Sequence, residues 1–296
     1  MNTQKKITFL GGDERQITAV RRLSSCGYNV STFACAQIEG EALNSFETLN
    51  TALNSSDIIV LPLPSSVDGA SLNAPFWTGD KIYFSQITEL LDFNSACRLV
   101  IGGRIPEGFA INLQSKNIQV IDYFKSEAFQ IENAYTTSEA ALSIAMNNLK
   151  RNIKDASFAI TGYGRIARTL TELLLKLGAD VCVLARKESD LAWASLAGAM
   201  PKRLNEDGIK SLTRGYDIIF NTVPTWLFFE DFLLNVDKNT LIIDLASAPG
   251  GVDVSSAKKL SSKVLWASSL PGKYAPESAG ELIADCIIKI VSEVEL

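Results

Sequence analysis

The residues with the clearest chemical meaning form a glycine-rich segment in the middle of the chain. Residues 157–187 contain an apolar run, a glycine turn, a helical pattern and a second apolar run. Such a turn lets the backbone approach a pyrophosphate closely, and the helix start supplies amide donors and a positive dipole end. The turn and helix start fit the pattern G-x-G-x-x-A with Gly162, Tyr163, Gly164, Arg165, Ile166 and Ala167. The segment predicts a dinucleotide site; the alternative is a domain of this shape that has lost its ligand.

The end of the second apolar run indicates which dinucleotide to expect. Domains that prefer NAD carry a carboxylate at this position, where it binds the ribose 2′-hydroxyl. Here the position is Arg186, followed by Lys187 and then Ser189. A guanidinium can hold a 2′-phosphate through two hydrogen bonds, with Lys187 or Ser189 assisting, whereas a carboxylate would repel it. The sequence therefore predicts NADP, and the alternative is a solvated basic pair in a loop.

Two later strand ends are expected to face the nicotinamide half of the cofactor, because open α/β sheets bind ligands outside the carboxyl ends of their strands. The residues concerned are Asn221, Thr222, Val223 and Pro224 after one strand, and Asp244, Ala246 and Ser247 after the next. For Asn221 and Asp244 the alternative is that each caps its own loop.

Polar side chains elsewhere could bind an anion or accept a proton. Each alone is more often a turn or surface residue, but three of the groups follow strands of one expected sheet, which favours a shared cleft. The candidate cations are Arg15, Arg104 and Lys273, and the candidate hydroxyl donors are Ser65, Ser66 and Thr137. Asp13 and Glu139 are the candidates for accepting a proton, with helix capping as their alternative role.

Composition narrows the chemistry further. The chain has no histidine, which excludes a Ser-His-Asp triad and the His-carboxylate pair of most hydroxy-acid dehydrogenases, and no metal site is expected. The net charge is −5 without a basic run, so we expect neither nucleic acid nor a membrane as partner. Five scattered cysteines lack a C-x-x-C pair, which indicates free thiols and a cytoplasmic location.

Short apolar runs alternate with helical patterns along the whole chain, which predicts an α/β protein with two doubly wound parallel-sheet domains. Residues 138–152 are expected to form a helix with Ser138 as its N-cap, and residues 65–80 a functional loop or lid. The expected strands are 7–10, 29–33, 57–61, 98–101 and 119–121, then 157–161, 180–184, 216–221 and 241–245. The expected domains are a flavodoxin-like substrate domain (1–135), a linker helix (136–152), a Rossmann domain (153–275) and a helix returning to the first domain (276–296).

Several motifs together resemble the family of the dipicolinate synthase A subunit over nearly the whole chain. Thr136, Ala140 and Glu277 depart from the family's usual Pro, Gly and Lys. The matching strings are Gly11-Gly12-Asp13-x-Arg15-Gln16, Asn133-x-x-x-Thr137-x-Glu139, Gly162-x-Gly164-Arg165, Ala185-Arg186, Asn221-Thr222-x-Pro224, Asp244-Leu245-Ala246-Ser247-x-Pro249-Gly250-Gly251-x-Asp253 and Leu270-Pro271-Gly272-x-x-Ala275-Pro276-x-x-Ala279-Gly280.

The resemblance implies the two-domain arrangement of D-2-hydroxyacid and alanine dehydrogenases. It implies a flavoprotein-like B subunit of dipicolinate synthase for a partner, and it leaves a homo-oligomer open. It also implies NADP-dependent oxidation of a dihydrodipicolinate-level intermediate to dipicolinate in the mother cell of a sporulating bacterium. Aromatisation drives that reaction, so it suits a chain without histidine. The alternatives are another NADP-dependent small-carboxylate dehydrogenase and a non-catalytic NADP-binding subunit.

Overall fold

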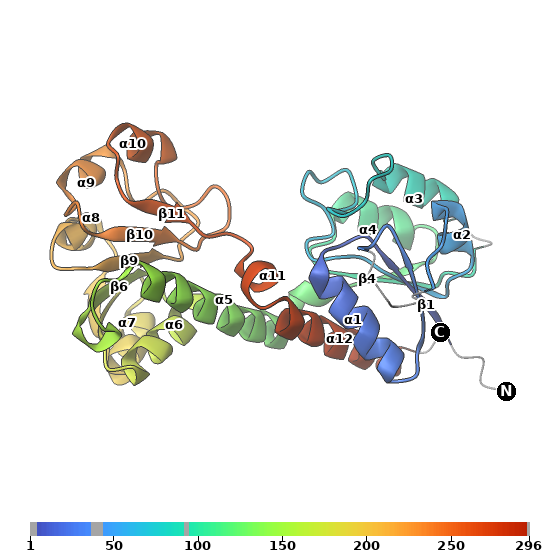
Figure 1. Ribbon diagram of the computed structural model, residues 1–296, viewed down its shortest axis with the longest axis horizontal. Helices are drawn as coiled ribbons and strands as arrows, with labels where there is room; N and C mark the ends of the chain where they lie inside the picture. Colours follow the sequence, from blue (N-terminus) through green and yellow to red (C-terminus); the bar gives the residue numbers. More distant parts are fainter. Residues whose placement is uncertain (1–4, 37–43, 92–94, 295–296) are drawn as a thin grey trace. The chain divides into compact units, whose positions relative to one another are not determined.

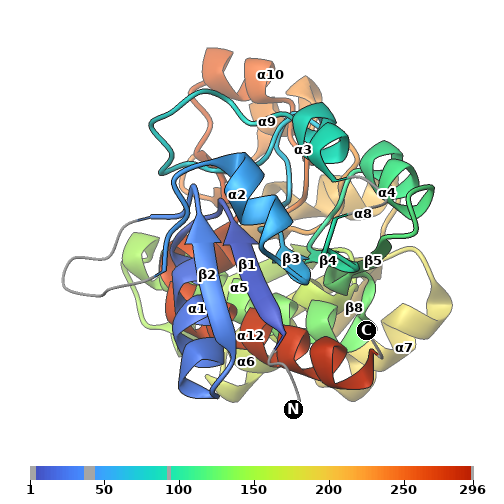
Figure 2. The same cartoon turned by 90° about the vertical axis from the view of Figure 1, so that its right-hand side faces the viewer.

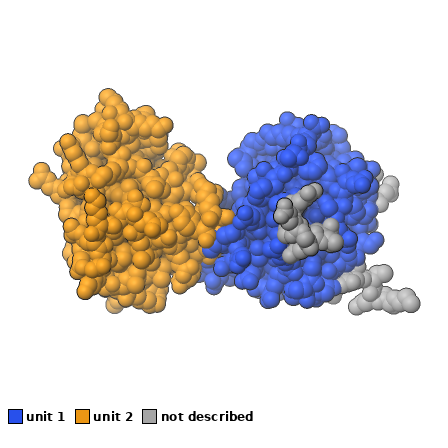
Figure 3. All heavy atoms as spheres, viewed as in Figure 1, with its two compact units in different colours: residues 1–132, 275–296 blue, residues 133–274 orange. Residues whose placement is uncertain are grey.

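The computed structural model describes residues 5–36, 44–91 and 95–294. The chain divides into two compact units, Met1–Glu132 with Ala275–Leu296 and Asn133–Tyr274, which Figure 3 distinguishes by colour. Both units are α/β structures built on a parallel sheet (Figure 1). Among the described residues, none of the helices has the length and apolar character needed to cross a membrane.

Unit 1 contains a five-stranded parallel sheet in the order β2-β1-β3-β4-β5. Its strands are short, apolar and rich in β-branched residues, as expected for a sheet that is covered on both faces. All five strands expected in this part are present: β1 (Lys6–Leu10), β2 (Asn29–Phe33), β3 (Ile58–Val60), β4 (Leu99–Gly102) and β5 (Gln119–Asp122). The helices between them are α1 (Glu14–Ser25), α2 (Leu49–Asn54), α3 (Phe84–Leu90) and α4 (Glu107–Gln114), and the short η1 (Tyr123–Lys125) follows β5.

The last helix, α12 (Pro276–Glu293), packs along α1 within unit 1 (Figures 1 and 2). A Cβ at Gly280 would lie 2.5 Å from Thr18 Cβ and 2.6 Å from Arg15 O, so the glycine allows this close approach. Ile283 and Ile287 are fully covered and join the core of the unit 1 sheet. The carboxyl-terminal helix is therefore part of the first unit's core.

Unit 2 contains a six-stranded parallel sheet in the order β11-β10-β9-β6-β7-β8. The chain starts at a central strand and winds outward in both directions, which is the doubly wound order of nucleotide-binding sheets. The strands are β6 (Ser157–Thr161), β7 (Asp180–Ala185), β8 (Met200–Arg203), β9 (Ile218–Asn221), β10 (Leu241–Asp244) and β11 (Val264–Trp266). The helices are α6 (Arg165–Lys176), α7 (Glu188–Leu196), α8 (Glu206–Lys210), α9 (Glu230–Asn235), α10 (Val254–Lys259) and α11 (Leu270–Tyr274), with η2 (Ile153–Asp155) and η3 (Ser211–Thr213).

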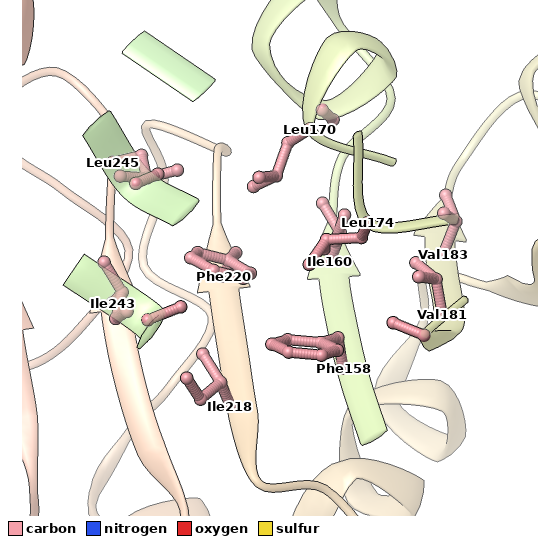
Figure 4. Packing of buried hydrophobic residues seen from close by; sticks show 14 of the residues in the cluster. Phe158, Ile160, Leu170, Leu174, Val181, Val183, Ile218, Phe220, Ile243 and Leu245 are labelled. Atoms are coloured by element: carbon pink, nitrogen blue, oxygen red, sulfur yellow. The ribbon is translucent and has the colours of Figure 1, made fainter. Parts of the chain in front are cut away.

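The core of unit 2 lies between this sheet and the helices that cover it. Phe158 on β6 and Phe220 on β9 stack with ring centroids 6.1 Å apart, beneath Leu170 and Leu174 of α6 (Figure 4). The edge strands β8 and β11 were not expected from the sequence. Pro201 interrupts the pattern of β8, and proline is tolerated in a sheet only at such an edge.

The expectation that a helix begins at Ser138 is wrong. Helix α5 runs from Glu127 to Asn148, so Ser138 lies in its interior. Its hydroxyl contacts Thr169 Oγ1 on α6 at 2.6 Å and donates to Ala134 O at 2.9 Å. The first turns of α5 carry many polar residues, so they lack the apolar periodicity by which a helix is recognised.

Candidate functional site

The glycine turn between β6 and α6 forms an open cradle at the carboxyl end of the sheet. Gly162 has φ +92°, and a Cβ there would lie 2.5 Å from Thr222 Oγ1. Gly164 is the N-cap of α6 and provides no side chain to cap its amides, and a Cβ on it would meet no described atom within 4 Å. Ala167 is fully buried, so α6 packs closely on the sheet. The turn therefore presents amide donors to an anion without obstruction.

A pocket of about 960 Å³ opens beside the carboxyl ends of β7, β8 and β9. It is large enough for a nucleoside-sized ligand. Its lining combines cations, an amide and aromatic rings, and includes Arg186, Asn205, Arg214, Val223, Trp226 and Phe229. Trp226 and Phe229 pack edge to face with centroids 6.2 Å apart. The arrangement suits an aromatic base beside an anionic group.

The remaining expected residues after β7 are exposed. Lys187 is the N-cap of α7, and Ser189 lies in the first turn of that helix.

Arg165 and Ile166 begin α6 directly after the glycine turn. Tyr163 lies inside that turn, and its carbonyl accepts a 3.1 Å hydrogen bond from Arg168 Nε.

Asn221 and Asp244 are the centre of a buried polar network that joins three strand ends. Asn221 Oδ1 accepts from Thr161 Oγ1 at 2.6 Å, and Asn221 Nδ2 donates to Val223 O and to Asp244 Oδ1. Asp244, only 3% exposed, also accepts from the amides of Ala246 and Gly251 at 3.1 and 2.7 Å. Both side chains thus form their hydrogen bonds within the protein, and these bonds hold the loops after β9 and β10 in place.

The other residues expected at these two strand ends form the loops themselves. Thr222 Oγ1 donates to Thr161 O at 2.8 Å, and Val223 lines the pocket described above. Pro224 and Ser247 are exposed, while Ala246 is buried. The structure therefore brings the glycine turn, Arg186 and both of these loops together at the carboxyl ends of the strands of unit 2.

In unit 1, Asp13 and Arg15 form a tight pair at the end of β1. Asp13 caps α1 by accepting from Arg15 N, and it receives Arg15 Nε at 2.9 Å and Nη2 at 2.7 Å. The guanidinium also donates to Leu63 O and is nearly buried. Capping, the alternative role foreseen for Asp13, is the one that the structure shows.

The three candidate hydroxyl groups all have intramolecular partners. Ser65 is fully buried and hydrogen-bonds the carbonyls of Pro62 and Gly103, each at 3.0 Å. Ser66 donates to Ser71 O at 2.6 Å, and Thr137 donates to Asn133 O within α5. These bonds fix the local backbone.

Arg104, Glu139 and Lys273 are the exposed members of the candidate set. Arg104 follows β4 with φ +54°, and its guanidinium carbon lies 4.4 Å from the Phe124 ring centroid. Glu139 lies in the interior of α5, so it caps no helix. Asp13, Arg15, Ser65, Ser66 and Arg104 all belong to unit 1, whereas Thr137, Glu139 and Lys273 belong to unit 2.

The loop after β3 is fixed by hydrogen bonds at several points. Asn73 O accepts from Gly12 N at 2.9 Å, and Asn73 Nδ2 donates to Pro64 O. Trp77 packs against Phe33 at 5.2 Å and donates from Nε1 to Asp80 O. Hydrogen bonding to Lys81 holds the pKa of Asp68 well below its usual range. These contacts join the loop to the ends of β1 and β2 within unit 1.

Two buried polar residues of unit 1, Gln16 and Tyr123, were not among the candidate site residues, although Gln16 belongs to one of the motifs quoted above. The amide of Gln16 and the hydroxyl of Tyr123 have no hydrogen-bond partner within the part of the chain that the structure describes. Burial raises the pKa of Tyr123, so its hydroxyl stays neutral. Tyr123 directly follows β5, so the tendency of ligands to bind at the carboxyl ends of strands could have identified it as a candidate. The pocket residues Asn205, Arg214 and Trp226 carry no comparable local signal.

Comparison with solved structures defines the fold class. The fold is similar to that of alanine dehydrogenase and of D-2-hydroxyacid dehydrogenases. An L-alanine dehydrogenase structure is similar with a TM-score of 0.62, covering 96% of this chain and 88% of that one at 13% identity.

Other comparisons concern the A subunit of dipicolinate synthase. Residues 6–124 match the family model of the N-terminal domain of the dipicolinate synthase A subunit. The A subunit of dipicolinate synthase from Bacillus subtilis (strain 168) is 28% identical, covering all of this chain and 98% of that protein. The crystal structure of the A subunit of dipicolinate synthase from Bacillus halodurans is similar with a TM-score of 0.85 and 26% identity, covering 99% of this chain and 100% of that one. The chain is thus similar over its whole length to dipicolinate synthase A subunits of two Bacillus species.

Proposed function

We propose that this protein is the NADP-dependent dehydrogenase component that oxidises a dihydrodipicolinate-level intermediate to dipicolinate. The observation that carries the proposal is the pocket at the end of β7, because Arg186 lines it and the open glycine turn lies at the same sheet edge. The names of the homologous chains from two Bacillus species support dipicolinate as the product. Their sporulating mother cell is the proposed setting, and the five free cysteines fit its cytoplasm.

The residues of unit 2 fit a dinucleotide in a defined way. The amides at the start of α6 would hold the pyrophosphate, and Gly164 leaves the space that the pyrophosphate needs. Arg186, with Lys187 or Ser189, would bind the 2′-phosphate, and the pocket wall with Trp226 would receive the adenine. When bound, NADP supplies the hydride acceptor. Asn221 and Asp244 position the loops that border the nicotinamide half.

The substrate side rests on the exposed candidates. Lys273 of unit 2 is our choice for binding a substrate carboxylate, because the guanidinium of Arg15 in unit 1 already binds Asp13 and Leu63 O. Glu139 is our choice for accepting the proton, since Asp13 is committed to capping α1. Loss of one hydride and one proton makes the ring aromatic, so these residues need only orient the ring and remove a proton. The relatives are named as one lettered component of a synthase, so a second, different polypeptide would complete the enzyme.

A coupled assay tests this function. Dihydrodipicolinate synthase would generate the intermediate, and absorbance of the pyridine product and of NADPH would be followed with the purified chain and NADP. We expect equal amounts of dipicolinate and NADPH. Absence of both products, with and without the second polypeptide, would contradict the proposal. Tight NADP binding without turnover under either condition would instead identify a non-catalytic cofactor-binding component.

A further inference from the structure

The segment after β7 carries two cations and two carboxylates, so its net charge is zero. Arg186 and Lys187 are followed by Glu188 and Asp190. In the fold, each carboxylate is bound by an arginine from a neighbouring element: Arg203 pairs with Glu188, and Arg168 pairs with Asp190 at 3.0 Å. No ion pair joins Arg186 or Lys187 to a carboxylate in the part of the chain that the structure describes. Two arginines thus neutralise the acids and leave the two cations available.

The Glu188–Arg203 pair is adjacent in the chain to residues that line the pocket. Arg203 is the last residue of β8 and stands opposite Ala185 in the sheet register, one residue before Arg186. Leu204 N donates to Ala185 O at 2.9 Å, and Leu204 lines the pocket together with Arg186. Glu188 is thus two residues from Arg186 in the chain, and Arg203 is in register with the residue before Arg186. Charges act on one another over about 8 Å at physiological salt.

The pair is too exposed to matter much for folding. The side chain of Arg203 is 52% exposed and that of Glu188 is 80% exposed. Exposed ion pairs contribute little to stability because water and salt screen them. Their influence on a bound anion is larger, because a carboxylate next to a 2′-phosphate repels it, and a carboxylate after this strand is the group that selects NAD.

We propose that Arg203 is a specificity-determining residue, which selects NADP by neutralising Glu188. This inference rests on the proposed function of the pocket. With Arg203 present, the phosphate meets the positive charge of Arg186 and Lys187. Without it, Glu188 repels the phosphate and becomes free to accept a hydrogen bond from the 2′-hydroxyl of NAD.

Four proteins test the proposal: the full-length wild type, Arg203→Ala, Glu188→Gln and the double variant. The dissociation constants of NADPH and NADH would be measured by fluorescence titration at low and high salt. We expect Arg203→Ala to weaken NADPH binding roughly fivefold at low salt, while NADH binding is unchanged or tighter. Glu188→Gln should tighten NADPH binding, and the double variant should return to within about twofold of the wild type. High salt should reduce all of these effects.

Lys176→Ala is the matched control, because it also leaves an exposed carboxylate, Glu172 on α6, without its lysine. It should leave the affinity for NADPH unchanged. If Arg203→Ala and Glu188→Gln shift NADPH affinity in the same direction, or if the double variant stays as weak as Arg203→Ala, the inference is wrong while the cofactor site stands. A wild type that binds NADH as tightly as NADPH would overturn the NADP assignment and the inference together.

Discussion

Asn221 Nδ2 donates a 2.8 Å hydrogen bond to Asp244 Oδ1, although the two residues are 23 positions apart in the chain. The bond joins the ends of β9 and β10 beside the glycine turn. A Cβ at Gly250 would lie 2.8 Å from Asp244 Oδ2, and one at Gly251 would meet Asn221 Nδ2 still more closely. The returning loop therefore needs glycine at both positions in order to enclose this pair.

Replacing Asp244 with Ala should destabilise unit 2. The substitution removes the acceptor for Asn221 Nδ2 and for the amides of Ala246 and Gly251, all of them covered. Leaving buried donors unpaired costs about 3 kcal/mol in a case of this kind. The midpoint of urea unfolding, followed by circular dichroism, measures the effect. Ser247→Ala, at an exposed position of the same loop, is the control, and equal midpoints for both variants would refute the structural role of the network.

The two glycines of the turn after β6 should respond differently to alanine. Gly164 has φ −80° and free space at its Cβ position, so Gly164→Ala should fold normally but lose cofactor affinity, because its methyl group meets the pyrophosphate. Gly162→Ala should also lower stability by about 1–2 kcal/mol, because of its positive φ and the nearby Thr222 hydroxyl. Unfolding midpoints and NADPH titrations on the same samples separate the two effects. Unchanged NADPH affinity in Gly164→Ala would place the pyrophosphate elsewhere.

Arg186→Ala should weaken NADP binding far more than NAD binding. The loss corresponds to roughly 1.5–3 kcal/mol, as expected for a charge-assisted hydrogen bond to the 2′-phosphate. Calorimetric titration with both cofactors measures the difference, and Arg186→Lys should recover part of it because the charge remains. Equal weakening of both cofactors would show that Arg186 does not contact the 2′-phosphate.

Gly280→Val should destabilise unit 1 by separating α12 from α1. The new side chain would meet Thr18 and the carbonyl of Arg15, and overpacking of this kind costs about 1–3 kcal/mol. Glu281→Ala, at the exposed neighbouring position, should change stability little. Thermal unfolding of the full chain compares the two variants, and a Gly280→Val protein as stable as Glu281→Ala would argue against the packing of these helices.

Stability should fall above pH 9, partly because of Cys97. Burial raises the pKa of this thiol from 9.0 to about 12. The unfolded chain loses the proton near pH 9 while the folded chain keeps it, so the free energy of unfolding decreases as pH rises from 9 toward 12. Urea unfolding at pH 8 and pH 10.5 should show a smaller decrease for Cys97→Ala than for the wild type. An identical decrease in both proteins would mean that the thiol is accessible in the folded state.

Much of the fold could be predicted because it depends on local patterns. The continuous apolar run of β3 and the alternation of strands with helical segments identify parallel sheets without tertiary information. The edge strand β8 was not predicted because Pro201 and its charged neighbours break that pattern. The start of α5 was not predicted because the first turns of this helix are polar. The place where the helix begins depends on packing rather than on periodicity.

The sequence by itself determined the glycine turn and the place of Arg186 at the end of β7, since both depend on the order of residues within one strand–turn–helix unit. Only the tertiary structure decided which charges around that unit remain available. Arg203 and Arg168 reach Glu188 and Asp190 because β8 pairs beside β7 and α6 packs nearby. Likewise, Asn221 meets Asp244 only because β9 and β10 align in parallel register. Electrostatic interactions depend on the distance between charges in space, and the separation of two residues along the chain does not predict that distance.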